Sequence, residues 1–301
     1  MPILEAIPNY SEGRRPEVIT AIISCFSRPG VHLLDAHSDQ DHNRSVISAA
    51  GEPEPLLEAL FAATAEAARL IDLRRHEGAH PRLGATDVIP LVPIEGLTME
   101  DCVAYSRALG ARIGGELAIP VYLYEHSATR PERRNLAEIR RGEFEGLPAR
   151  LKEPGHEPDY GPAAAHISAG ATVVGARRPL VAFNAYLDTD RLEVAKAVAK
   201  AVRASSGGLV GVKALGLAVP DQGLVQVSMN LVDTEATPIQ RALELVQIEA
   251  ASYGARVIKT EIVGLVPEQV LLEAARFYLG LEGFSPGQVL EIRLKEAAVH
   301  G

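Results

Sequence analysis

The sequence predicts an α+β protein made of two ferredoxin-like βαββαβ subdomains, with helices packed on mixed sheets. Three observations predict this fold class. The 301 residues are enough for two ordinary domains, each with its own core. Strand-like runs and helical periodicity follow one another in the order βαββαβ, and that order returns in the second half of the chain. The hydrophobic fraction of 47% and the charged fraction of 23% are typical of globular proteins.

The first half opens with a short apolar strand, residues 3–7. A helix is predicted over residues 16–26, because Val18, Ile22 and Phe26 share one of its faces. The other predicted elements of this half are strands at 31–36, 44–50, 88–94 and 120–124, and helices at 56–71 and 99–117.

The second half repeats the pattern. A helix over residues 191–204 is followed by the breaker pair Gly207-Gly208. Strands are predicted at 180–187, 209–219, 224–232 and 257–263, with helices from 238 onward and at 267–281. We therefore expect an N-terminal subdomain at 1–177 and a C-terminal one at 178–301.

Two connections, residues 71–87 and 157–175, are much longer than the other loops of the predicted fold. Loops of this length inside small domains are usually functional or disordered. Both are dense in His, Arg, Gly or Pro, so we expect them to be functional and to border a ligand cleft between the subdomains. The stretch 131–178 is expected to join the halves. The arginines near it alternate with acidic residues and are expected to form a solvated helix face: Arg130, Arg133, Arg134, Arg140 and Arg141.

Composition excludes several partners. The net charge is −9 at pH 7, whereas nucleic-acid binding needs a basic surface. No apolar run approaches the ~20 residues that span a bilayer, so no membrane is expected as a partner. The start of the chain lacks the features of a signal peptide, and Cys25 and Cys102 lie in apolar helical patterns typical of reduced core thiols. A cytoplasmic protein is expected.

Residues 76–80 read H-E-G-A-H, which matches the H-E-x-x-H signature of zinc hydrolases. That chemistry needs both histidines one turn apart on a continuous helix. Gly78 lies inside the motif, and Pro81 disfavours helical geometry for His80. We therefore expect no metal, and zinc hydrolysis remains an alternative that metal analysis would decide.

His80 stands out from the nine histidines by its surroundings. It lies in a loop shaped by Gly and Pro, between Arg75 and Arg82, just before the strand at 88–94. The ordinary pKa of histidine is near physiological pH, so this side chain can both take and give a proton. His80 is the candidate catalytic residue.

Several segments resemble the glutamate formimidoyltransferase family. Residues 8–14 read P-N-Y-S-E-G-R, similar to the family's P-N-F-S-E-G opening. Residues 78–88 read G-A-H-P-R-L-G-A-T-D-V, similar to its G-x-H-P-R-x-G-A-x-D-V segment. Further similar segments lie at Asp35, 43–44, 69–72, 120–124, 139–143, 158–162, 170–177, 182–184, 226–231 and 261–267. The resemblance covers almost the whole chain.

The resemblance implies transfer of a formimidoyl group from N-formimidoyl-L-glutamate to N5 of tetrahydrofolate, giving 5-formimidoyltetrahydrofolate and L-glutamate. It implies His80 as the catalytic residue, tetrahydrofolate as co-substrate, a folate tunnel between two subdomains, and a homodimer. The folate-binding segment carries over to Gly161, Pro162, Ala163, Ala164, Ala165, His166, Ile167, Ser168, Ala169 and Gly170.

The chain departs from the family pattern in places. His37 stands where vertebrate relatives carry an acidic residue, Glu77 is outside the pattern, and residues 163–169 match only in position. The chain ends after the transferase region, so a separate cyclodeaminase is expected to process the product.

Both substrates carry carboxylates. Arg44, Arg82 and Arg177 are the expected partners, bidentate where geometry allows, and Arg178 is expected to be solvated charge. Two other functions remain open: formyl transfer between 5-formyltetrahydrofolate and glutamate, and non-catalytic folate binding.

Overall fold

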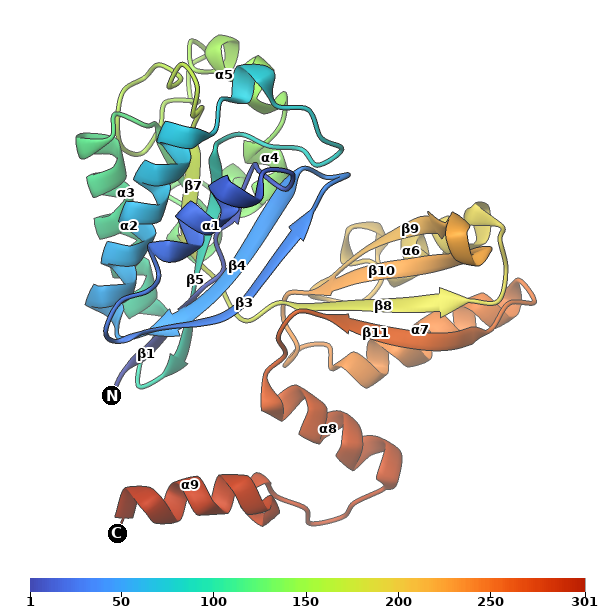
Figure 1. Cartoon of the computed structure of the whole chain (residues 1–301). Coiled ribbons are helices and arrows are strands. Elements are labelled where there is room, and N and C mark those ends of the chain that lie inside the picture. Colours follow the sequence, from blue (N-terminus) through green and yellow to red (C-terminus); the bar gives the residue numbers. More distant parts are fainter. Residues whose placement is uncertain (301) are drawn as a thin grey trace. The chain divides into compact units, whose positions relative to one another are not determined.

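Strands and helices are distributed over two units, Met1–Arg178 and Pro179–Gly301, in a computed structural model that describes residues 1–300 (Figure 1). Each unit has its own sheet and its own hydrophobic core, and each is described by itself. Sheets and helices together confirm the α+β class.

The sheet of the first unit mixes antiparallel and parallel pairs. Its strands are β1 (Ile3–Ala6), β2 (Asn9–Tyr10), β3 (Val31–Asp39), β4 (Arg44–Gly51), β5 (Thr86–Glu95), β6 (Val121–Leu123) and β7 (Thr172–Ala176). Strands β1 and β2 are consecutive pieces that both lie between β4 and β5, and β3 adds to the outer edge of β4. These pairs are antiparallel, whereas β5, β7 and β6 run parallel to one another.

Three helices cover one face of this sheet: α1 (Pro16–Ser24), α2 (Pro53–Leu70) and α3 (Met99–Glu116) (Figure 1). Their apolar stripes meet inward-facing strand residues in one core, in which Leu60 of α2 and Ile89 of β5 are fully buried. The helical periodicity of the sequence therefore predicted this layer correctly.

The stretch 131–178 does not simply join the two halves, which corrects our expectation. It contains α4 (Leu136–Ile139), α5 (Glu143–Arg150) and β7, and its apolar residues form a second core with the opposite face of the sheet. That core includes Val88 and Leu147. Parallel strands are normally buried on both faces, which explains why the β5–β7–β6 part needs this extra layer.

The sheet of the second unit is antiparallel throughout, with the order β11-β8-β10-β9. Its elements are β8 (Val181–Leu187), α6 (Leu192–Val202), β9 (Val212–Val219), β10 (Leu224–Leu231), α7 (Ile239–Ser252) and β11 (Val257–Val263). A mixed sheet was expected here and is wrong for this unit. The two strands that each helix connects are parallel, but an antiparallel strand lies between them.

The remaining elements are α8 (Glu268–Leu279), α9 (Leu290–His300) and short 3₁₀ turns at Leu73–Arg75, Glu125–Ser127, Pro131–Arg134, Ala204–Ser206, Pro220–Gln222 and Pro286–Gln288. The sequence reading did not include α9. Within residues 1–300, no helix has the length and apolarity needed to cross a membrane.

Candidate active site

The segment 76–80 is a loop, not a helix. Both nitrogens of the His76 ring are bonded within the protein: Arg82 Nε donates to Nδ1 at 3.0 Å, and Nε2 lies 2.9 Å from the carbonyl oxygen of Asn43. Because Nδ1 accepts, Nε2 carries the proton and donates to that carbonyl. The H-E-x-x-H pattern therefore does not present its two histidines as helical zinc ligands require.

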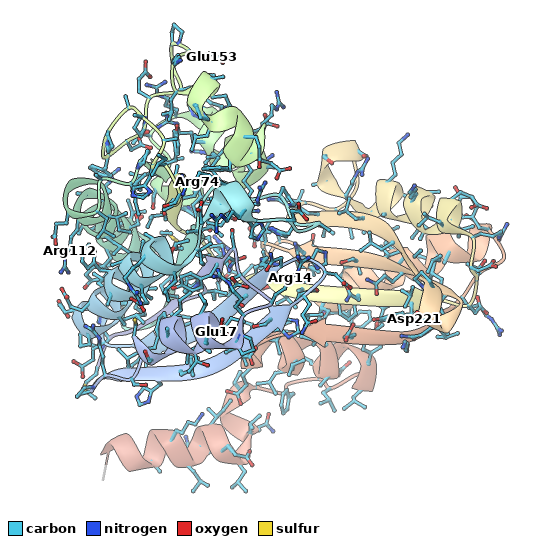
Figure 2. The ribbon with its side chains drawn as sticks, turned by 45° about the horizontal axis from the view of Figure 1, so that its top comes forward. Arg14, Glu17, Arg74, Arg112, Glu153 and Asp221 are labelled. Atoms are coloured by element: carbon cyan, nitrogen blue, oxygen red, sulfur yellow. The ribbon has the colours of Figure 1, made fainter. Side chains whose placement is uncertain are left out.

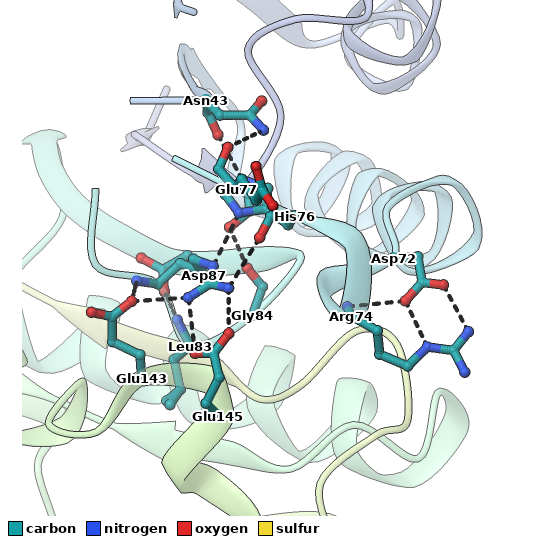
Figure 3. Close-up of polar contacts among 12 residues, drawn as sticks. Asn43, Asp72, Arg74, His76, Glu77, Leu83, Gly84, Asp87, Glu143 and Glu145 are labelled. Carbon is teal, nitrogen blue, oxygen red and sulfur yellow. Dashed lines mark hydrogen bonds and ion pairs between the residues drawn. The ribbon is translucent and has the colours of Figure 1, made fainter. Parts of the chain in front are cut away.

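The loop is joined to the turn between β3 and β4 (Figure 3). The Asn43 side chain donates to the carbonyl of Glu77 at 2.9 Å, and the Ala79 amide donates to the carbonyl of Asp41 at 3.2 Å. A Cβ at Gly78 would collide with the carbonyl oxygen of His42, so only glycine permits this approach. The result is that residues 41–43 lie against the loop that carries His80.

His80 lies in a small hollow that is rich in charged and polar groups. The hollow is lined by Asn9, Tyr10, Ser11, His42, Asn43, Arg44, His76, His80, Arg82 and Asp87. Partial burial lowers the pKa of His80 to about 4, and the positive charges of Arg44 and Arg140 add to this effect against the opposing charge of Asp87. His80 is therefore a neutral imidazole at neutral pH, suited to accept a proton.

Arg44 and Arg140 are the cations beside His80. Arg44 Nε donates to Asn9 Oδ1 at 2.9 Å, and burial lowers the pKa of this guanidinium to about 10. Arg140 pairs with the buried carboxylate of Asp87, while Arg140 Nε is buried with no hydrogen-bond partner among the described residues. An orphaned buried donor beside His80 fits an anionic group of a ligand.

The expectation of a solvated face for the arginines of 130–141 is wrong for two of them. Arg140 is 13% exposed, and Arg133 is buried in an ion pair with Asp159, with Nη1 2.7 Å from Oδ2. Charged side chains such as Glu17 and Arg74, labelled in Figure 2, show the ordinary exposed case. Alternation of charges along the sequence did not show which arginines turn inward, because the chain around 131–150 is folded over the sheet.

Arg82 is committed to the protein itself, and its partners His76, Glu143 and Glu145 are labelled in Figure 3. Nη1 bonds Glu143 Oε2 at 2.9 Å and Glu145 Oε2 at 3.0 Å; Nη2 bonds Glu145 Oε1 at 2.6 Å and the carbonyl of His76 at 3.3 Å. With Nε on His76, all five donors are used. The expected carboxylate-binding role does not fit this geometry, and Arg82 instead holds the His76–His80 loop against α5.

A second imidazole faces His80. The rings of His42 and His80 are arranged edge to face, with centroids 6.2 Å apart and an interplanar angle of 85°. His42 Nδ1 lies 2.7 Å from Asp39 Oδ2, and the His42 amide donates to Asp39 Oδ1 at 2.8 Å. These hydrogen bonds lower the pKa of Asp39, so its carboxylate is ionised beside the ring. Sequence reasoning missed His42, because nothing in the turn 39–43 indicates that it approaches the loop at 80.

The segment 161–170 reaches the His80 loop at its carboxyl end. The Ala85 amide donates to the carbonyl of Ala169 at 3.0 Å, and Gly170 forms a β-bridge with Gly84. The other end is exposed at residues 161–164, and Ile167 is also exposed. The sequence-predicted segment and the sequence-predicted catalytic residue thus belong to one connected structure within the first unit.

Two other residues singled out in the sequence lie elsewhere. Arg177 follows the carboxyl end of β7, and its amide pairs with Leu91, whereas His80 precedes the amino end of the parallel strand β5. Arg177 is therefore not brought to His80. His37 is exposed on β3 opposite Val46, and it is not among the residues lining the hollow.

Comparison with known proteins identifies the family. The model of the formiminotransferase domain, N-terminal subdomain, matches residues 3–177, and the model of the formiminotransferase domain matches residues 182–292. The chain is 47% identical to a glutamate formimidoyltransferase of Streptococcus pyogenes serotype M1, over 97% of this chain and 98% of that protein. It is 46% identical to one of Thermoplasma acidophilum, over 99% of both.

A formimidoyltransferase-cyclodeaminase of Rattus norvegicus is 41% identical over 93% of this chain but only 53% of that longer protein. The matched segments therefore correspond to about half of the rat chain and to nearly all of the two microbial ones. The resemblance read from the P-N-Y-S-E-G and H-P-R-x-G segments is confirmed, and the chain belongs to the formiminotransferase family.

Proposed function

We propose that this protein transfers the formimidoyl group of N-formimidoyl-L-glutamate to N5 of tetrahydrofolate, releasing 5-formimidoyltetrahydrofolate and L-glutamate. The chain is 47% and 46% identical to two glutamate formimidoyltransferases over nearly its full length, and this similarity supports the reaction. The observation that carries the residue assignment is a neutral His80 in the hollow, close to the positive charges of Arg44 and Arg140.

His80 is the proposed base. When N5 attacks the formimidoyl carbon, N5 becomes acidic and must lose its proton. An imidazole that is already deprotonated accepts it without first discharging a proton to solvent, and such catalysis is worth about 10²–10⁴-fold. The remaining acceleration comes from holding two large substrates in the reacting geometry.

Arg44 and Arg140 are the proposed partners of substrate carboxylates. Both guanidinium groups lie beside His80, and Arg140 retains a buried donor without a partner among residues 1–300. An Arg–carboxylate pair in such a site is directional as well as attractive. We do not carry Arg82 and Arg177 forward, because one is fully bonded internally and the other lies at the far end of β7.

The folate segment 161–170 stays a proposal, supported by its hydrogen bonds to residues adjoining the His80 loop. A close approach of backbone to ligand suits its exposed, glycine-bounded start. The strand order β5-β1-β4-β3 of the first unit and β11-β8-β10-β9 of the second supports a ferredoxin-like assignment for both.

The domain assignment follows from the same features. We propose an N-terminal formiminotransferase subdomain at 1–177 with the catalytic His loop, and a C-terminal one at 178–301. The ligand tunnel between them, the homodimer and the absence of a metal requirement stay predictions. So does the cytoplasmic location.

The test is turnover with defined donors. Purified protein is mixed with tetrahydrofolate and either N-formimidoyl-L-glutamate or N-formyl-L-glutamate, and the folate product is converted by acid to its absorbing methenyl form. We expect product from the formimidoyl donor, and a loss of about 10²–10⁴-fold in kcat for His80→Ala with folate binding retained.

Each contrary outcome has its own meaning. Turnover of the formyl donor alone would replace formimidoyl by formyl transfer. Folate binding without any turnover, unaffected by His80→Ala, would indicate a binding protein. Stoichiometric zinc that is lost in His76→Ala would restore the hydrolase alternative.

A further inference from the structure

The proposed transfer, on which this inference rests, needs two proton movements at different nitrogens. One proton leaves N5 of tetrahydrofolate, and another must reach the glutamate nitrogen before the C–N bond can break. Both nitrogens are bonded to the same carbon in the tetrahedral intermediate. Two acid–base groups on either side of that carbon can therefore serve one nitrogen each.

The hollow contains two such groups in contact. His42 and His80 line it together, their rings edge to face with centroids 6.2 Å apart. They come from different segments, His42 from the turn between β3 and β4 and His80 from the loop before β5. The hydrogen bonds of Asn43 to Glu77 and of Ala79 to Asp41 fix this approach.

The electrostatic surroundings of the two rings are opposite. His80 faces Arg44 and Arg140, whose charges disfavour a protonated ring against the weaker effect of Asp87. His42 faces the ionised carboxylate of Asp39, with Oδ2 2.7 Å from its Nδ1. When two neighbouring titratable groups lie in different electrostatic environments, one can act as the base and the other as the acid.

We propose that His42, oriented by Asp39, is the general acid that protonates the departing glutamate nitrogen, while His80 acts as the base at N5. In the protonated ring, Nδ1–H donates to the Asp39 carboxylate and Nε2–H remains as a second donor. This is the arrangement in which a carboxylate holds an imidazole in one orientation and stabilises its charged form.

The step balances without another reactant. N5 forms a bond to the formimidoyl carbon while the C=N π pair moves onto the imino nitrogen, and the N5 proton passes to His80. His42 then gives its Nε2 proton to the glutamate nitrogen. The C–N bond to glutamate breaks with its electron pair on that nitrogen, and the pair on the imino nitrogen re-forms the C=N bond. His80 ends protonated and His42 neutral, so one proton returned from His80 to His42, directly or through water, restores both groups.

The experiment compares His42→Ala and His42→Gln with His32→Ala in the assay above. His32 is the matched control, because it is an exposed histidine on the same strand β3, opposite Ala50 and away from the Asp39 end. We expect kcat to fall about 10²-fold in both His42 variants, with KM for tetrahydrofolate changed less than about threefold. His32→Ala should match the wild type.

The pH profile separates an acid from a merely structural residue. Loss of the His42 proton should produce an alkaline limb in kcat of the wild type, and this limb should vanish in both variants. The charged groups around the pair that enter this profile are Asp39, His80, Arg44, Arg140 and Asp87. Because the side chain of His42 is 52% exposed, added imidazole should restore part of the rate of His42→Ala.

The inference is overturned if either folded variant keeps kcat within threefold of the wild type, or if the alkaline limb survives the substitution. His42→Gln retains hydrogen-bonding capacity toward Asp39, so it covers the case in which His42→Ala fails to fold. Normal wild-type turnover with unaffected His42 variants would overturn this inference alone. A wild-type protein without turnover would overturn the proposed function and this inference together.

Discussion

Four strands of the first unit, β5-β1-β4-β3, follow the same order as the four strands β11-β8-β10-β9 of the second, but the two units differ in how deeply they bury charged side chains. In the first unit, Arg133 and Arg140 are 6% and 13% exposed, and each is paired with a nearly buried aspartate. In the second unit, Arg256 pairs with Asp188 but is 84% exposed. The first unit also has an added layer over the second face of its sheet, to which α4 and α5 contribute Ile139 and Leu147.

This difference indicates that the first unit carries the candidate active site. Burying a charge costs several kcal/mol even when it is paired, so buried ion pairs are a weak source of stability. The Arg140–Asp87 pair acts on His80, and a buried charge pair beside a histidine with a shifted pKa is typical of a site where charge is controlled. The substitutions below compare the effect on stability of buried charged groups in the first unit with that of an exposed ion pair in the second.

The largest effect is expected for Arg140→Met. The substitution leaves the carboxylate of Asp87, which is 2% exposed, buried without its cation. We expect a loss of about 3–5 kcal/mol in the free energy of unfolding, measured by urea denaturation. Asp87→Leu in addition should recover much of the loss, and a single-variant loss below 1 kcal/mol would contradict the buried-pair interpretation.

A smaller loss, about 2–3 kcal/mol, is expected for Arg82→Met. Five hydrogen bonds disappear, but the side chains of Glu143 and Glu145 are 41% and 63% exposed and can be rehydrated. Thermal unfolding should show a midpoint lower by several degrees. Glu145→Gln is the matched control for charge, and an unchanged midpoint in Arg82→Met would show that the loop does not depend on this arginine.

The third prediction concerns pH. The pKa of His80 is about 4 in the folded protein against an ordinary value near 6.5. As the pH falls, this ring is therefore protonated in the unfolded chain before it is protonated in the folded protein. His80 therefore destabilises the fold increasingly as pH falls from 6.5 to 4 and has no such effect above 6.5. Allowing for partial exposure, roughly 1 kcal/mol is expected at pH 4.

The measurement is the unfolding midpoint of wild type and His80→Gln at pH 7 and pH 4.5. The unfolding midpoint of the variant, relative to that of the wild type, should be higher at pH 4.5 than at pH 7. An equal difference at both pH values would show that His80 titrates as an ordinary exposed histidine.

The smallest effect is expected for Arg256→Met in the second unit. Exposed ion pairs contribute about 0–1 kcal/mol, and this guanidinium is almost fully solvated. Urea denaturation should therefore show less than 1 kcal/mol of change. A loss as large as that of Arg140→Met would remove the contrast between the units.

Much of the fold was readable from the sequence. The β1, β3, β4, β5, α1, α2 and α3 elements all begin within three residues of where apolar periodicity predicts them. The strand β7 was missed because the run Thr172–Ala176 is short and lies inside a Gly-rich segment. Helices α4 and α5 were missed because their charged residues concealed the few apolar ones, such as Ile139 and Leu147, that cover the sheet.

The candidate site was only partly readable. The motif around His80 and the candidate Arg44 came from the sequence, whereas Arg140 was assigned to a solvated face and His42 was not considered. Arg82 was assigned to substrate, although its donors are used by Glu143, Glu145 and His76. Residue type and motif indicate that an arginine can bind a carboxylate, but they do not indicate which carboxylate reaches it first.

The sequence alone determined the α+β class, the order of most elements and the loop that carries His80, because periodicity, turn residues and motifs act over short distances along the chain. Only the tertiary structure decided that His80 is neutral, that His76 is bonded on both ring nitrogens, and that His42 faces His80. The physical reason is that a pKa depends on burial and on charges a few ångströms away. Those charges, on Arg44 and Arg140, come from segments that only folding brings together.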